Sequence, residues 1–151
     1  MINSEQFHQA FLDSPRKHIL NITNHGIHQW QIIPGLTDTG GQNVFVNQFS
    51  DALADQGFKI TIINRGGYTH PISGEMRRGL HYKNPHQRIY FLEDGVNEFV
   101  RKEDMLEQIP DLKTALKDFI LQDGSQVDVI ISHYWDAAIL GIAYLEEQPK
   151  D

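Results

Sequence analysis

Four short apolar runs, rich in β-branched residues, predict strands that are buried on both faces of a sheet. They cover residues 18–23, 58–63, 88–92 and 127–131. Apolar residues at helical spacing predict helices between and around these runs. They cover residues 4–12, 42–56 and 103–122, with a last helix from Asp136, as its capping residue, to Tyr144. This alternation indicates an α/β fold: a Rossmann-like, mainly parallel sheet with helices on both faces.

The pattern also makes finer predictions within these elements. Pro110 lacks a backbone donor and is expected to divide residues 103–122 into two helices. Residues 24–41 and 65–87 are rich in Gly and Pro and predict long loops, the second with a hairpin near residues 80–82. The face of helix 42–56 that is expected to be buried holds Val44, Phe45, Phe49, Ala52 and Leu53.

Composition narrows the class of protein. The chain has 151 residues, with 13 basic and 20 acidic side chains, a formal charge of −7 and no Cys. It is long enough for one domain with a real core, and the lack of Cys excludes disulfides, Cys-ligated zinc and thiol chemistry. An acidic chain is a poor general nucleic-acid binder. No apolar run approaches the roughly 20 residues that a membrane span needs. The first residues show no secretory signal. We therefore expect a cytoplasmic protein with no nucleic-acid partner and no membrane span.

The strongest candidate for ligand binding is the turn at residues 37–42, which joins the first long loop to the helix after it. Gly40 and Gly41 let the backbone approach a ligand closely, and a helix N-terminus offers unpaired N–H groups with a partial positive charge. Such a turn suits a phosphate or another oxygen-rich ligand. An ordinary turn capped by Asp38 or Thr39 explains the same residues equally well. The run matches neither GxGxxG nor a Walker loop.

Two further candidates follow strands and are expected at the same carboxyl edge of the sheet, where open α/β sheets bind ligands. Residues 132–136 follow the fourth apolar run, and His133, Tyr134 and Asp136 suit sugar hydroxyls. Packing of Tyr134 and Trp135, with Asp136 as the cap of the helix, is the alternative explanation for this segment. Arg65 follows the second run and suits an anion, although a surface Arg in a flexible loop fits as well.

The histidines give weaker signals. His25 and His28 are three residues apart, but they lie in a loop with no HExxH motif and no Cys. A metal-assisted hydrolase that uses His25, His28 and His133 is therefore the weakest functional hypothesis, and no GxSxG motif indicates a serine hydrolase. We expect neither a metal nor a cofactor.

Two of these motifs resemble those of a known family. Residues 38–42, DTGGQ, are similar to the D-T-G-G-Q loop of the sucrose synthases and sucrose-phosphate synthases, which are retaining glycosyltransferases. Residues 132–137, SHYWDA, are similar to a segment of the same group. Between these two motifs, shorter matches occur in the same order as in the family, at residues 53–57, Arg65 and residues 102–104.

This resemblance, which covers about residues 18–145, implies the incomplete N-terminal half of a GT-B glycosyltransferase, in which two Rossmann-like domains face a cleft. We expect residues 1–151 to form one truncated acceptor-side domain without the donor domain. The full enzyme would move a hexose, with retention, from a nucleotide sugar such as a UDP- or GDP-hexose to a sugar-type acceptor. The chain alone would be inactive, because the catalytic residues are expected beyond Asp151.

The resemblance also assigns roles to residues of this chain. The residues it places at the acceptor are Gly40, Gly41, Gln42 and Tyr134, with support from His133 and Asp136. The alternative to an enzyme is a non-catalytic Rossmann-like module that binds a sugar or a phosphate.

One position departs from the family pattern. Sucrose-phosphate synthases carry a basic residue near their F-x-P-K-E run, where it meets the acceptor phosphate, whereas this chain has Glu98 at that place and Arg101 at the proline. A carboxylate repels a phosphate. We therefore expect a non-phosphorylated acceptor, unless Arg101 or Arg65 compensates.

Overall fold

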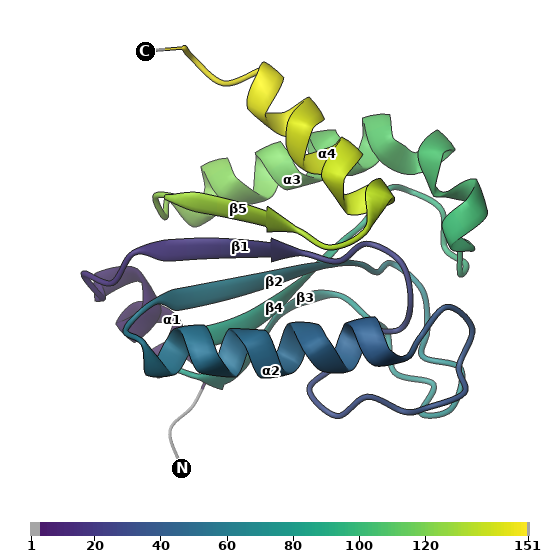
Figure 1. Cartoon of the computed structure of the whole chain (residues 1–151), viewed down its shortest axis with the longest axis horizontal. Coiled ribbons are helices and arrows are strands. Elements are labelled where there is room, and N and C mark those ends of the chain that lie inside the picture. Colours follow the sequence, from purple (N-terminus) through teal and green to yellow (C-terminus); the bar gives the residue numbers. More distant parts are fainter. Residues whose placement is uncertain (1–3, 151) are drawn as a thin grey trace.

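The computed structural model describes residues 4–150, and its elements follow the predicted order (Figure 1). Residues 1–3 and 151, which the domain prediction included, lie outside the described residues. The helices are α1 (Ser4–Asp13), α2 (Gly41–Asp55), α3 (Ile109–Asp123) and α4 (Trp135–Glu146), with a 3-10 helix η1 (Lys102–Gln108) before α3. The strands are β1 (His18–Ile22), β2 (Lys59–Arg65), β3 (Gly79–Asn84), β4 (Gln87–Leu92) and β5 (Val129–Ser132).

The five strands form one mainly parallel sheet in the order β3-β4-β2-β1-β5. β1 lies in the middle of the parallel part, with Ile19 opposite Ile60 of β2 on one side and Val129 of β5 on the other. β2 is also parallel to β4, and β3 pairs with β4 in the antiparallel direction. The predicted α/β class and the hairpin near residues 80–82 are therefore confirmed.

Helices cover both faces of the sheet, as predicted (Figure 1). α3 and α4 pack on one face, where Leu20 and Ile22 of β1 join the larger core. α2 packs on the other face, where Val46 meets Ile19 and Ile60. Because both faces are covered, every residue of β1 and β2 is buried, including polar residues such as Asn21 and Thr61.

The predicted break at Pro110 is confirmed, because η1 ends at Gln108 and α3 begins at Ile109. Pro110 lies in the first turn of α3, where its missing N–H costs no helical hydrogen bond. The predicted cap at Asp136 is wrong. Tyr134 is the residue that precedes α4, and the carboxylate of Asp136 pairs instead with the ring of His25.

The predicted buried face of α2 is wrong for most of its residues, although Leu53 packs against the smaller core. Its buried residues are Asn43, Val46 and Ser50, whereas Phe45 is 55% exposed. The helix is rotated because two polar residues find partners inside: Asn43 Nδ2 lies 3.3 Å from Nδ1 of His28, and Ser50 Oγ accepts the side-chain amide of Asn21. A buried polar group that is hydrogen-bonded carries little penalty, so apolar spacing alone gave the wrong face.

The two edges of the sheet differ in character. β3 carries polar side chains such as His81 and Lys83, as exposed edge strands commonly do. β5 has the sequence VIIS, typical of a strand that is covered on both faces, yet it forms the opposite edge. Val129 of β5 is itself exposed, and the exposed ring of Phe45 of α2 lies edge-on to His133, the residue after β5. No helix within residues 4–150 is long and apolar enough to cross a membrane.

Candidate functional site

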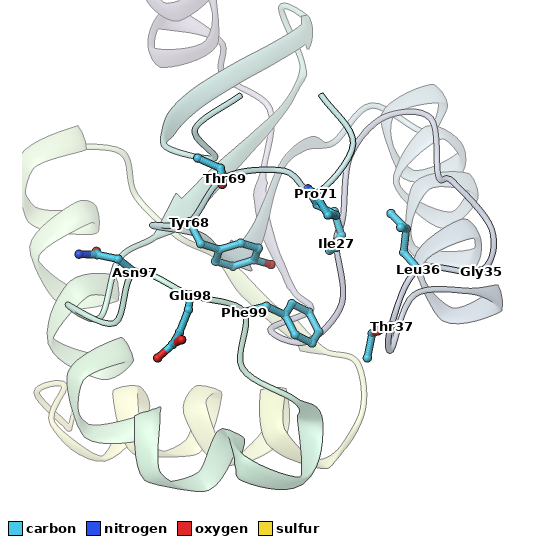
Figure 2. Close-up of a pocket in the computed structure, with 10 residues that line it drawn as sticks. All are labelled: Ile27, Gly35, Leu36, Thr37, Tyr68, Thr69, Pro71, Asn97, Glu98 and Phe99. Carbon is cyan, nitrogen blue, oxygen red and sulfur yellow. The ribbon is translucent and has the colours of Figure 1, made fainter. Parts of the chain in front are cut away.

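A cavity of about 530 Å³ opens among loops that leave the carboxyl ends of β1, β2 and β4. Figure 2 shows the lining residues around the ring of Tyr68, with Asn97 and Glu98 on one side and Ile27 and Leu36 on the other. The remaining lining residues are Gly35, Thr37, Thr69, Pro71 and Phe99. The position matches the expectation that open α/β sheets bind ligands at the carboxyl ends of their strands.

The lining of this cavity is mixed, with hydroxyl groups, an amide and apolar rings. Among the ten residues that line it, Glu98 is the one with a charged side chain. The rings of Tyr68 and Phe99 meet edge to face, with their centroids 5.9 Å apart. The cavity therefore offers hydrogen-bonding groups beside apolar walls, together with one exposed carboxylate.

A buried ion pair shapes the loop that carries Glu98. Arg65, the last residue of β2, donates from Nε and Nη2 to the two carboxylate oxygens of Asp94, at 2.6 and 3.0 Å. The same guanidinium donates to the carbonyls of Val96 and Glu98, at 2.8 and 2.9 Å. Arg65 is 1% exposed, so it is not available to a bound anion, and the expectation that it grips a ligand is wrong. It positions the loop 94–98 instead.

A second buried arginine fixes the ring of Tyr68. Arg77 donates from Nη1 to the hydroxyl of Tyr68, at 2.6 Å, and to the carbonyl of Arg65. From Nη2 it donates to the carbonyl of His28 and to Oδ1 of Asn64. Burial raises the pKa of the Tyr68 hydroxyl and lowers the pKa of Arg77. No local pattern predicts this role, since Arg77 lies 12 residues after Arg65 in a loop.

The predicted glycine turn lies at the start of α2, beside this cavity. Thr37 lines the cavity, and Gly40 follows it by three residues, just before the first turn of α2. Among the described residues, a Cβ added at Gly40 or at Gly41 would meet no atom within 4 Å, so space is open on that side of both residues. Gln42 donates from Nε2 to Oγ1 of Thr23, 3.0 Å away, at the end of β1.

The turn is held against its neighbours on both sides. A Cβ at Gly26 would lie 2.5 Å from the carbonyl oxygen of Asp38, and Gly26 has a φ of +80°, so only glycine fits where the two loops meet. The carboxylate of Asp38 accepts the backbone N–H of Lys102, at 2.9 Å. The glycine turn is thus tied to the loop after β1 and to η1.

The second predicted cluster lies at the end of β5 and contacts the loop after β1. Asp136 is fully buried, and its Oδ1 lies 3.0 Å from Nδ1 of His25. Tyr134 is half exposed and packs edge-on against the ring of His25, with a centroid distance of 4.9 Å. His133 lies 3.4 Å from Oδ1 of Asn21, and burial lowers its pKa.

Tyr134 has an unusual backbone for a residue with a side chain. Its φ is 79° and its ψ is 169°, a region that is populated almost entirely by glycine. Strained residues of this kind cluster at binding and catalytic sites. The Nζ atom of Lys102 lies 5.8 Å from the centre of the Tyr134 ring.

The structure therefore places the predicted residues at one edge of the sheet, in two groups that both contact the loop after β1. Gln42 contacts Thr23, and Tyr134 and Asp136 contact His25. Of the residues that the sequence singled out, Thr37 of the glycine turn and Glu98 line the cavity of Figure 2. The lining does not include Gly40, Gly41, Gln42, Arg65, His133, Tyr134 or Asp136. Tyr68 was within reach of sequence reasoning, because it ends the polar run that begins at Asn64.

The histidines do not form a metal centre. His25 pairs with Asp136, and His28 lies between Asn43 and Asn47. Burial lowers the pKa of His28 to about 3, so its ring is uncharged at neutral pH. Across residues 4–150, no three His, Asp or Glu side chains come together as ligands for a metal ion.

Sequence comparison finds glycosyltransferases, although no protein-family model matches the chain. It is 31% identical over 108 residues to the D-inositol 3-phosphate glycosyltransferase of Corynebacterium efficiens, which is 72% of this chain and 24% of that protein. It is 29% identical over 133 residues to the enzyme of the same name from Kribbella flavida, which is 87% of this chain and 29% of that protein. The chain thus spans about a quarter of the length of these relatives.

Structure comparison finds the sucrose-phosphate synthase of Thermosynechococcus elongatus. The TM-score is 0.72 at 26% sequence identity, and the match covers 88% of this chain and 31% of that chain. The resemblance that residues 38–42 and 132–137 predicted is therefore confirmed, and so is the Rossmann-like fold.

Proposed function

Because this chain resembles GT-B glycosyltransferases in both sequence and fold, we propose that it is the acceptor-side part of a retaining hexosyltransferase. The donor in the whole enzyme is a nucleotide sugar, bound by a second domain that these 151 residues do not contain. Two observations support this division of the enzyme into an acceptor-side domain and a donor-side domain. The matches cover about a quarter to a third of the related proteins, and apolar side chains stay exposed around the edge strand β5.

The cavity beside the glycine turn is the proposed acceptor site. Its hydroxyl and amide groups suit the hydroxyls of a sugar or cyclitol, and the rings of Tyr68 and Phe99 suit the apolar face of such a ring. The glycine turn and Tyr134, at the same edge, would face the sugar that is being transferred.

The charge of the cavity bears on whether the acceptor is phosphorylated. Glu98 is the charged residue of the lining, and Arg65 is committed to Asp94 and to two carbonyls. Arg101, the other arginine that could compensate, is exposed and is not part of the lining. The curated relatives are named for D-inositol 3-phosphate, a phosphorylated acceptor. We propose that this chain favours an acceptor without a phosphate, because no free cation in the lining balances the carboxylate.

Amide chemical shifts of the labelled chain, titrated with myo-inositol and with D-glucose, test the site. We expect saturable shifts in three loops, at residues 35–37, 68–69 and 97–99, and weaker binding in Glu98→Gln. Glu93→Gln is the matched control, since Glu93 is exposed and pairs with Arg78 outside the lining. Shifts that avoid these loops, or equal affinity in Glu98→Gln, would contradict the proposal.

A further inference from the structure

A second, smaller cavity of about 190 Å³ lies among the loops after β1 and β2 and the strands β3 and β4. Its lining includes Trp30, His70, Glu75, Met76 and His81. It shares no lining residue with the cavity of Figure 2. A ligand bound here would therefore contact none of the residues that line the proposed acceptor site.

His70 presents an unused hydrogen-bond donor in this lining. Its Nδ1 atom accepts the backbone N–H groups of Ile72 and Ser73, at 3.1 and 3.2 Å. An acceptor nitrogen carries no proton, so the proton of the uncharged ring lies on Nε2. His70 is 6% exposed, and Nε2 has no partner among the described residues. Buried donors without an acceptor are rare in folded proteins, which points to an oxygen-bearing occupant.

The same lining also offers acceptors. The carboxylate of Glu75 is exposed and takes part in no ion pair within residues 4–150. His81 donates from Nε2 to the carbonyl of Arg78, 2.7 Å away, which leaves Nδ1 as an acceptor. One donor beside two acceptors matches hydroxyl groups, because each hydroxyl both donates and accepts.

The rest of the lining favours an uncharged ring over an anion. Trp30, Met76 and Phe91 supply apolar surface. The one buried cation of the lining, Arg77, directs its Nη donors to four uncharged oxygens, those of Arg65, Tyr68, His28 and Asn64. An anion would therefore find few charged donors, and it would meet the carboxylate of Glu75.

We propose that this cavity binds a single uncharged polyhydroxyl ring, such as one hexose unit, separately from the acceptor. His70 Nε2 donates to one hydroxyl of the ring, Glu75 accepts from another, and Trp30 contacts the apolar face. The small volume suits one ring and not a nucleotide sugar.

Tryptophan fluorescence gives a direct test. The chain has two Trp residues, so Trp135→Phe leaves Trp30 as the single reporter, and Trp135 lies at the start of α4, outside this lining. The probes are D-glucose, D-galactose, D-mannose and D-fructose, compared with inorganic phosphate. We expect a saturable change in Trp30 emission with at least one hexose and none with phosphate.

His70→Asn tests the hydrogen-bond donor at Nε2 without removing the acceptor that holds the backbone of Ile72 and Ser73. The Asn carbonyl replaces Nδ1 as the acceptor for Ile72 and Ser73, while the donor at Nε2 is lost. We expect affinity to fall by about ten-fold or more, which is about 1.4 kcal/mol, with the same circular dichroism spectrum and a similar melting temperature. Glu75→Gln gives a second variant, with weaker binding expected and no change in the backbone contacts.

Glu98→Gln distinguishes this site from the proposed acceptor site, and it is expected to leave the Trp30 titration unchanged. No saturable response to any hexose, a response to phosphate, or unchanged affinity in both His70→Asn and Glu75→Gln would overturn the proposal. Amide shifts of the wild-type chain that move at residues 70–76 on hexose addition would support it without the Trp135 substitution.

Discussion

The ion pair between Arg65 and Asp94 is expected to hold both the fold and the candidate acceptor site, and Asp94→Asn tests it. The substitution keeps the size of the side chain but leaves the buried guanidinium without a counter-charge. Both carboxylate oxygens of Asp94 accept from Arg65, and Oδ1 also accepts the backbone N–H of Val96, at 3.0 Å. An amide offers one acceptor where the carboxylate offers two, and its NH₂ group would face the guanidinium donors.

The expected cost follows from the burial of the pair. The side chains of Arg65 and Asp94 are 2% and 0% exposed. Removing one partner of a buried ion pair costs about 3–5 kcal/mol, because the other charge stays desolvated. We therefore expect the free energy of unfolding to fall by about 3 kcal/mol, measured by urea denaturation with circular dichroism. For a chain of this length, the melting temperature should drop by roughly 6–12 °C.

The neighbouring residue supplies a matched control. Glu93 also forms a bidentate pair, with Arg78, but these side chains are 39% and 59% exposed. Surface pairs contribute about 0–1 kcal/mol, so Glu93→Gln should change the stability by less than about 1 kcal/mol. If Asp94→Asn cost no more than Glu93→Gln, the buried pair would not be what holds the 94–98 loop.

Three further predictions follow from other parts of the structure. The chain alone should show no turnover of UDP- or GDP-hexoses in a coupled assay for nucleotide release, and measurable transfer by these 151 residues would contradict the division of domains. Burial holds the pKa of His28 at about 3 and that of His18 at about 4, below the ordinary histidine value of 6.5. Between these pKa values and 6.5, the unfolded chain therefore binds more protons than the folded chain. The free energy of unfolding should therefore fall as the pH drops from about 6.5 towards 4, by up to about 1.4 kcal/mol per pH unit for each ring, and a slope unchanged in His28→Gln would refute this. Tyr134→Gly should stabilise the chain by about 1 kcal/mol in urea denaturation, because glycine relieves the strained backbone, whereas Tyr134→Phe should have little effect.

Much of the fold was predictable because apolar spacing reports burial directly. The runs that became β1 and β2 are buried throughout, and Pro110 marks the start of α3. The prediction failed for α2, where Asn43 and Ser50 are buried by virtue of hydrogen bonds to distant residues. Such partners are 15 and 29 residues away in the sequence, and no local pattern reveals them.

The sequence predicts at which edge of the sheet the site lies, but it does not predict the partners of the individual side chains. Strand order alone brings the loops after β1 and β5 to one edge, and the structure has both there. The role of Arg65 was not predictable, because Asp94 lies 29 residues later in a loop and neutralises it inside the protein. His25 was considered as a metal ligand, but its partner is the carboxylate of Asp136, 111 residues away.

The choice between an uncharged and a phosphorylated acceptor can be measured on the chain itself as a difference in binding affinity. Isothermal titration would compare myo-inositol with inositol 3-phosphate, and D-glucose with glucose 6-phosphate, for the wild type and for Glu98→Lys. We expect the wild type to bind the uncharged ligands more tightly, and Glu98→Lys to raise the relative affinity for the phosphate esters by about ten-fold or more, which is about 1.4 kcal/mol. A wild type that prefers the phosphate esters, with a preference unchanged in Glu98→Lys, would contradict the account.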